Sequence, residues 1–199
     1  MIESRILRYL GYPSGAEIDA ETSAVLQKAE SEVLEAADFR YLYAEFHELF
    51  PFLQKKAYAD YLAGAERYLL CATTLGVEID RRLKRWQLTD MHYATIFDAT
   101  ASAYLEQRAD EFERTLPYPA LGFRFCPGYA GSPLEDNRHI VSALHAERIG
   151  ISFLDSSLML PLKSMVGIVR IGERKTEKNC TNCAATANCP YRLKGQRCY

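Results

Sequence analysis

Hydrophobic and polar positions alternate with helical periods in some parts of the chain and with extended periods in others. The first helix is expected to begin after Asp19, which can act as an N-cap, with Glu21 in its first turn. Its stripe of small and apolar side chains continues to Ala36 and Ala37 and is only weakly amphipathic. In residues 39–44, aromatic side chains recur at every second position, which predicts a strand.

Two longer helical segments are predicted next. Residues 57–75 are expected to form a helix that ends at Gly76, because glycine can adopt the left-handed conformation that often follows a helix. Cys71 would then lie on this helix, in the core. Thr89 is a candidate cap for a third helix that runs to Thr115 and is stopped by the prolines that follow.

The last third of the chain changes character. Residues 122–126 alternate like a strand, residues 134–146 are typical of a short helix, and residues 151–154 and 165–171 are short and rich in β-formers. Because strands come both before and after the helices, the predicted class is α+β. We expect a single compact domain with a twisted antiparallel or mixed sheet and several helices, followed by a short cysteine-rich tail.

Composition limits the kind of protein this is. The chain has 199 residues, of which 48% are hydrophobic, enough for one domain with its own core. No run approaches the roughly 18 apolar residues of a membrane span, and the first residues do not form a basic-then-apolar signal peptide. We therefore expect a soluble, cytoplasmic protein without a membrane partner.

Charge and cysteine are both concentrated at the C-terminal end. Residues 170–199 hold seven Lys and Arg against two Asp and Glu, a balance of +5 within a total of −2. The predicted organisation is a domain over residues 1–172 and a charged hinge with a tail over residues 173–199. The acidic remainder and the lack of a basic stripe interleaved with aromatic residues argue against a nucleic-acid partner.

Four of the six cysteines lie in this tail: Cys180, Cys183, Cys189 and Cys198. In a reducing compartment such a cluster favours a metal over disulfides, and four thiolates suit zinc or an iron–sulfur cluster. The spacing matches no standard ferredoxin or zinc-ribbon pattern, so a tail without metal remains the alternative.

Three further features are candidates for binding chemistry. Asp98 lies on a face of small residues of the third helix, where a ligand could approach closely; tight helix packing is the alternative. Lys163 and Ser164 precede a strand in which Gly167 indicates a bulge or a close backbone contact. Ser164 could meet a polar ligand, although a solvated Lys163 is the ordinary interpretation.

The segment from Arg124 to Tyr129 is the third candidate. Arg124 can bind a carboxylate or phosphate in a bidentate way, Pro127 and Gly128 shape a turn that admits a ligand, and Tyr129 adds an aromatic face. Alone, it could equally be an ordinary Pro-Gly turn with a surface arginine.

Several stretches together resemble the stand-alone relatives of the activation domain of cobalamin-dependent methionine synthase. They cover nearly the whole chain in order: residues 6–12, 74–80, 98–103, 124–129, 133–135, 146–150, 159–164 and 189–192. Within them, the Arg-x-x-x-Gly-Tyr signature of the family is matched by Arg124, Gly128 and Tyr129. This ordered coverage is more specific than any single motif.

The resemblance implies an S-adenosylmethionine site at Arg124, Pro127, Gly128 and Tyr129, with Asp98 and Ser164 as further candidates. It also implies a partner, a cobalamin-binding methionine synthase or another corrinoid protein, because this chain has no cobalamin module of its own. In that family, a flavodoxin-type donor reduces the oxidised cobalamin, and bound S-adenosylmethionine then methylates it. The chain would thus be an accessory subunit for reactivation and not a self-contained catalyst. The alternative is an iron–sulfur redox or docking protein for a corrinoid methyltransferase.

Overall fold

The computed structural model describes residues 2–172, 190–193 and 195, and it has the predicted α+β architecture. Its main sheet contains β1 (Arg40–Phe46), β2 (Arg67–Thr74) and β5 (Ser164–Ile171) in the order β1-β2-β5, with both pairs antiparallel. A separate hairpin consists of β3 (Ser152–Phe153) and β4 (Met159–Leu160). The predictions of strands near residues 39–44, 151–154 and 165–171 are confirmed.

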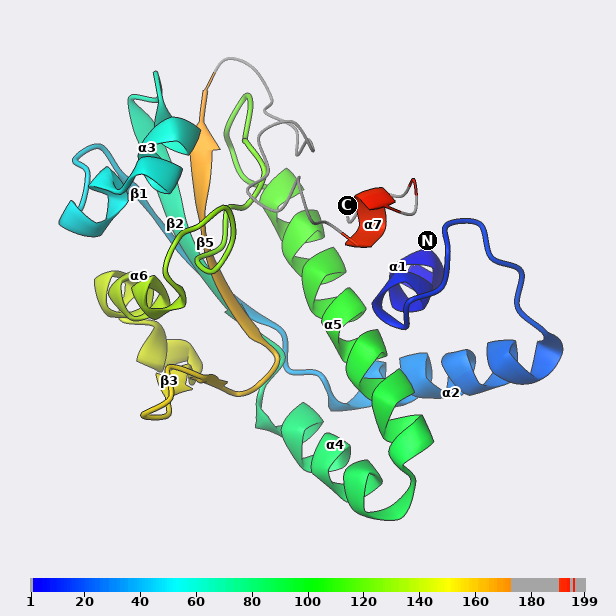
Figure 1. Cartoon of the computed structure of the whole chain (residues 1–199). Helices are drawn as coiled ribbons and strands as arrows, with labels where there is room; N and C mark the ends of the chain where they lie inside the picture. The colour runs from blue at the N-terminus through cyan, green and yellow to red at the C-terminus, as the bar shows by residue number, and fades with distance from the viewer. Residues whose placement is uncertain (1, 173–189, 194, 196–199) are drawn as a thin grey trace.

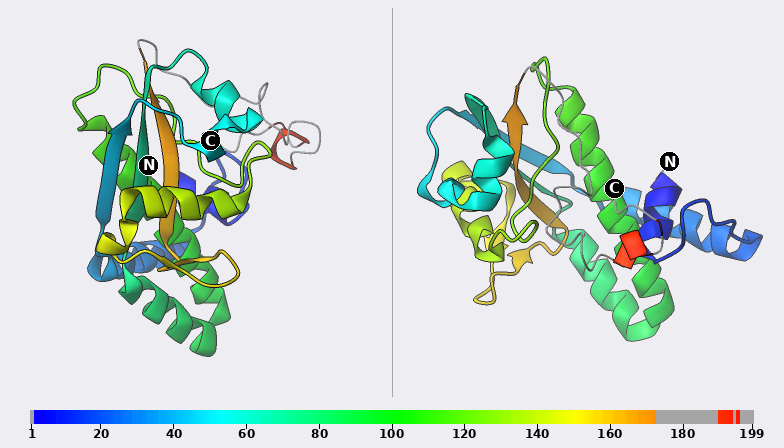
Figure 2. Two further views of the ribbon diagram at one scale, coloured as in Figure 1. Left: turned by 90° about the vertical axis from the view of Figure 1, so that its left-hand side faces the viewer. Right: turned by 45° about the horizontal axis from the view of Figure 1, so that its top comes forward.

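Helices cover both faces of the main sheet (Figures 1 and 2). One side carries the long helix α5 (Met91–Arg114). Three other helices pack with it on this side: α1 (Ile2–Tyr9), α2 (Ala20–Ala36) and α4 (Val77–Thr89). The other side carries the short 3-10 helix η1 (Pro51–Gln54), α3 (Lys56–Leu62) and α6 (Asn137–Leu144). Further short elements are η2 (Leu134–Asp136), η3 (Ala146–Ile149) and α7 (Pro190–Leu193).

The central strand β2 overturns the prediction of one helix over residues 57–75. Only α3 is helical there, and the chain then enters β2, which is buried along almost its whole length. Tyr68 and Leu70 pack toward α3 and α6, whereas Leu69 and Cys71 pack on the α5 side. A strand buried on both faces shows no polar alternation, so its apolar run cannot be distinguished from a buried helix by period alone.

Cys71 therefore lies on a strand, although its predicted burial is confirmed. Burial raises the pKa of its thiol to about 12, so the group is protonated at neutral pH. Its Sγ donates a hydrogen bond to the carbonyl oxygen of Gly167, its partner across the sheet, at 3.3 Å.

One of the two predicted N-caps is correct, and the other lies one residue away from the prediction. The Asp19 carboxylate accepts a hydrogen bond from the Thr22 amide at 2.7 Å, which confirms this N-cap. The third predicted helix, α5, is capped by Asp90 and not by Thr89. Thr89 instead ends α4, a helix that the sequence pattern did not reveal, and Gly76 precedes α4 instead of ending a helix. α1 was also missed.

Residues 121–125 run beside β5, where they take the place of an irregular fourth strand at the edge of the sheet. Bridges join Leu121 to Ile171 and Phe125 to Ile168, and the Gly122 amide donates to the Arg170 carbonyl oxygen at 2.8 Å. The strand predicted over residues 122–126 is thus present only as isolated bridges. The helix predicted over residues 134–146 corresponds to η2 and α6.

Among the described helices, none is both long enough and apolar enough to cross a membrane.

The Asp90 cap gives a first prediction. Its carboxylate accepts a hydrogen bond from the Tyr93 amide at 3.0 Å, and this bond starts α5, the helix on which the site described below depends. Asp90→Ala should lower the free energy of unfolding by about 1 kcal/mol. Asp90→Asn, which keeps a capping oxygen, should stay close to wild type in urea denaturation followed by circular dichroism. Equal stability of the Ala and Asn variants would contradict the role of this cap.

Candidate functional site

Arg124 lies between the sheet and α5, and its position depends on Gly167. Neighbouring Phe123 and Phe125 pack on the α3 side, so alternation along the edge segment turns Arg124 toward α5. A Cβ atom on Gly167 would stand only 2.5 Å from Cγ of Arg124, so the absence of a side chain there makes room for the arginine. Gly167 is in regular register with Cys71, and the close backbone contact expected there is with the Phe125 carbonyl oxygen, 3.2 Å from the same Cβ position.

The guanidinium of Arg124 binds two carboxylates of α5. It donates to Glu113 through Nη1 and to Asp110 through Nη2, the second at 3.1 Å, and its side chain is only 7% exposed. Burial by itself lowers the pKa of Arg124, but the charge of Glu113, together with smaller contributions from Cys71, Cys126 and Tyr41, holds the pKa above its ordinary value. Arg124 is therefore a fully charged group inside an ion-pair network and not a surface arginine.

Glu106, Asp110 and Glu113 form a row of acids along one face of α5, which we call the carboxylate row. Their spacing of four and three residues places them on the same side of the helix. Asp110 lies in the middle and accepts hydrogen bonds from Arg124 on one side and from Arg5 of α1, at 2.7 Å, on the other.

The two ends of the carboxylate row carry tyrosine hydroxyls. Tyr41 of β1 donates to Glu113 at 2.8 Å, and Tyr9 of α1 donates to Glu106 at 2.7 Å. Arg5 reaches Glu106 only at 3.8 Å, a distance without a hydrogen bond. Three carboxylates thus share two guanidinium groups, and one negative charge is left over at the Glu106 end.

The segment after Arg124 forms a tight loop, which we call the site loop (residues 126–132). Gly128 has φ +94°, a conformation that glycine adopts without strain. The Gly128 amide donates to two oxygens of Ser132: the carbonyl oxygen, at 3.2 Å, and the hydroxyl oxygen, at 3.1 Å. Tyr129 is 71% exposed. Burial raises the pKa of Tyr9, and the charges of Glu106 and Tyr129 raise it further.

Asp98 and Ser164 belong to a different polar group. Lys163 Nζ contacts the Asp98 carboxylate and the Ser102 hydroxyl, each at 2.8 Å, and Ser164 donates to the Thr74 hydroxyl at 2.9 Å. Asp98 precedes Asp110 by twelve residues on α5, which corresponds to about 18 Å along a helix. The structure thus brings Arg124, Pro127, Gly128 and Tyr129 together but does not bring Asp98 to them.

The partners of Arg124 were not among the residues that the sequence pattern predicts. Arg5 and Tyr9 come from α1, which was not predicted, and the carboxylate row went unnoticed on a helix that was predicted. The signal that could have revealed it is the i, i+4, i+7 spacing of three acids in the second half of α5.

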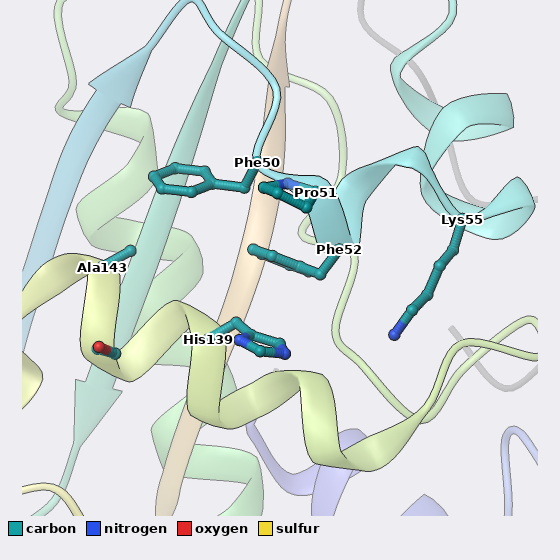
Figure 3. Close-up of a pocket in the computed structure, with 7 residues that line it drawn as sticks. Phe50, Pro51, Phe52, Lys55, His139 and Ala143 are labelled. Atoms are coloured by element: carbon teal, nitrogen blue, oxygen red, sulfur yellow. The ribbon is translucent and has the colours of Figure 1, made fainter.

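A shallow pocket of about 480 Å³ opens on the opposite side of the sheet, between η1 and α6 (Figure 3). Phe50, Phe52 and His139 line it, and the rings of Phe52 and His139 stack with centroids 5.1 Å apart. Lys55 lies at one side of the pocket, where its Nζ binds both oxygens of the buried Asp136 at 2.6 and 2.8 Å. None of the predicted site residues lines this pocket.

The predicted metal ligands, Cys180, Cys183, Cys189 and Cys198, lie outside the described residues, so the metal site stays a prediction. In the part of the chain that the structure describes, no three His, Cys, Asp or Glu side chains are grouped as metal ligands would be.

The contact between Gly167 and Arg124 gives a second prediction. Gly167→Ala should lower the free energy of unfolding by about 1–3 kcal/mol, because the new methyl group would overlap Cγ of an arginine that its ion pairs hold in place. In the background Arg124→Ala, where Cγ is absent, the same change should cost less than about 0.5 kcal/mol. Urea denaturation measures the change in the free energy of unfolding caused by Gly167→Ala in each background. Equal changes in both would mean that Arg124 is not the reason why position 167 requires glycine.

Comparison with known proteins finds a similarity in structure. No protein-family model matches the sequence, and no curated protein sequence matches it. Among solved structures, the crystal structure of the MetH reactivation domain bound to AdoHcy is similar, with a TM-score of 0.60 and 15% sequence identity. The match covers 98% of this chain and 77% of that domain. The chain therefore has the fold of the MetH reactivation domain, as its sequence resemblance predicted.

Proposed function

We propose that this protein binds S-adenosylmethionine between the site loop and α1, and that it presents this molecule for the reactivation of a cobalamin-dependent methionine synthase. The observation that carries the proposal is the Glu106 carboxylate, which accepts a hydrogen bond from Tyr9 and lies 3.8 Å from the guanidinium of Arg5, a group that Asp110 binds more closely. The shared fold with a domain that was crystallised with AdoHcy supports a ligand of this class.

The charge of the ligand suits this end of the carboxylate row. The sulfonium of S-adenosylmethionine is a positive centre, which a nearby carboxylate and the faces of aromatic rings attract. Glu106 supplies the carboxylate, and Tyr9 and Tyr129 are both exposed enough to contact a ligand. S-Adenosylhomocysteine lacks the positive charge, so the site should distinguish the two molecules.

The two arginines have different parts in this proposal. Arg124 is nearly buried and already binds Asp110 and Glu113, so its main contribution is to fix the carboxylate row against the start of the site loop. The side chain of Arg5 is 28% exposed, and its guanidinium is therefore the one open to the carboxylate of the ligand. Asp98 and Ser164, which lie with Lys163, are not included in this binding site.

The proposed reaction belongs to both proteins. A one-electron donor reduces the cob(II)alamin of the partner to cob(I)alamin. The methyl group of S-adenosylmethionine then passes to the cobalt as a cation, and S-adenosylhomocysteine is left. The cobalamin is thus the methyl acceptor, and this chain holds the methyl donor in place.

Titration calorimetry tests the binding site. We expect wild-type protein to bind S-adenosylmethionine several-fold more tightly than S-adenosylhomocysteine. Glu106→Gln keeps an acceptor for Tyr9 but removes the charge, and should reduce this preference by about fivefold, or about 1 kcal/mol. Glu111→Gln, on the same helix and paired with Gln107 and Arg108 instead, is the matched control and should leave the preference unchanged. No heat with either ligand, from folded protein at millimolar concentration, would reject the proposed site.

A reconstitution assay tests the role in reactivation. The partner is a cobalamin-binding methionine synthase without its own activation domain, with its cofactor in the cob(II) state and a one-electron reductant present. Adding this chain and S-adenosylmethionine should restore the absorbance of methylcobalamin, and Glu106→Gln should slow the recovery. Recovery at the same rate without the chain, or without S-adenosylmethionine, would reject the role.

A further inference from the structure

The strand β1 leaves one edge of the main sheet open. In the order β1-β2-β5, β1 pairs only with β2, whereas the outer edge of β5 is covered by the edge segment, residues 121–125. The left view of Figure 2 shows β1 at the margin of the sheet. The other described strands, β3 and β4, have two residues each and pair with each other, so no described strand covers the edge of β1.

The hydrogen bonds of the sheet show which residues of β1 face this open edge. In an antiparallel ladder, the N–H and C=O of one residue point to the same side, and the side alternates along the strand. Ile168 of β5 exchanges both of its hydrogen bonds with Phe125 of the edge segment, so it faces away from β2. Leu70 of β2, opposite Ile168, therefore faces β1, and Ala44, opposite Leu70, faces β2.

This alternation directs the N–H and C=O groups of Tyr41, Tyr43 and Glu45 at the open edge. The strand lacks the features that ordinarily prevent pairing at such an edge. Its seven residues include no Pro and no Lys, and its register with β2 runs from Arg40 to Phe46 without a bulge.

The side chains of β1 are also incompletely covered. Its apolar residues are only partly buried on both faces of the sheet, in contrast to those of β2. A further strand beside β1 would satisfy the outward backbone groups and cover these side chains at the same time.

The sequence of β1 is complementary to a second copy of itself. An antiparallel pair of identical strands has two-fold symmetry, and a pair centred on Tyr43 aligns all seven residues. Each outward-facing residue then meets an outward-facing residue of the other copy, with two hydrogen bonds at each of the three pairs. No like charges lie opposite each other, because the aligned pairs are Arg40 with Phe46, Tyr41 with Glu45, Leu42 with Ala44, and Tyr43 with itself.

We propose that β1 is a homodimer interface, in which the β1 strands of two copies pair antiparallel about a two-fold axis at Tyr43. The two three-stranded sheets would become one sheet of six strands. β2 and β5 lie between β1 and the edge segment that leads into the site loop, so the pairing keeps both site loops at the outer margins of the joined sheet. The inference does not depend on the proposed function.

Sedimentation of the full chain over a range of concentrations tests the dimer. Tyr43→Lys would place two ammonium groups opposite each other at the two-fold axis, and should raise the dissociation constant of the dimer at least tenfold. Leu88→Lys is the matched control, because Leu88 is 81% exposed on α4, outside the sheet, and should change the constant by less than about twofold. Circular dichroism establishes that both variants are folded.

Disulfide formation tests the register, and it does not depend on how Tyr43→Lys folds. Residues directly opposite in a hydrogen-bonded pair have Cα atoms about 5.5 Å apart, within the range of a disulfide. Oxidation of Tyr43→Cys with diamide should therefore link the two substituted positions. In Tyr41→Cys the substituted positions lie four residues apart along the ladder, about 14 Å, and should not be linked. Peptide mapping by mass spectrometry separates these links from disulfides of the native cysteines.

Each result decides the inference. A dimer that Tyr43→Lys weakens and Leu88→Lys does not, with a link at position 43 and none at position 41, supports it. Wild-type protein that stays monomeric at millimolar concentration rejects it, and so does a dimer that folded Tyr43→Lys leaves intact. A link at position 41 without one at position 43 rejects the register centred on Tyr43.

Discussion

The arrangement of this molecule depends on one buried charge, the guanidinium of Arg124. A cation that is only 7% exposed must be compensated nearby, and Asp110 and Glu113 of α5 provide this compensation. The ion pairs fix α5 against the edge segment beside β5, at a point where Gly167 leaves space for the arginine. Asp110 also binds Arg5, so the same carboxylate ties α1 to the assembly.

The chemistry of the site follows from how these charges are shared. At one end of the carboxylate row, Glu113 is 13% exposed and binds Arg124, whereas at the other end Glu106 is 35% exposed and accepts from the exposed Tyr9. One helix thus presents a structural end, which holds the sheet, and an open end, which suits a cationic ligand. The site loop begins directly after the edge segment that carries Arg124, so its start is held by the structural end of the helix.

Both ends of the site loop are held. On the α5 side, Arg124 fixes where the loop begins. At the other end of the loop, the buried Ser132 accepts from the Gly128 amide and donates to the Tyr129 carbonyl oxygen. An irregular loop with three positive φ angles can keep one conformation only if both of its ends are held in this way.

The sequence by itself determined the features whose causes are local. The N-cap at Asp19 and the period-two pattern of β1 depend on residues close in the chain, and the ordered resemblance pointed to the correct fold. The pattern of β2 predicts a helix wrongly, because burial on both faces removes the polar positions that mark a strand.

Only the tertiary structure decided which charges meet. Arg124 resembled a free ligand-binding arginine in the sequence, but the fold pairs it with two acids of α5. Asp110 is separated from Arg5 by 105 residues, and no local pattern can indicate such a contact. Asp98 and Ser164 were grouped with the signature by chemistry alone, and the length of α5 places Asp98 far from it. Ion pairs depend on distance in space, which side-chain type and spacing along the chain do not specify.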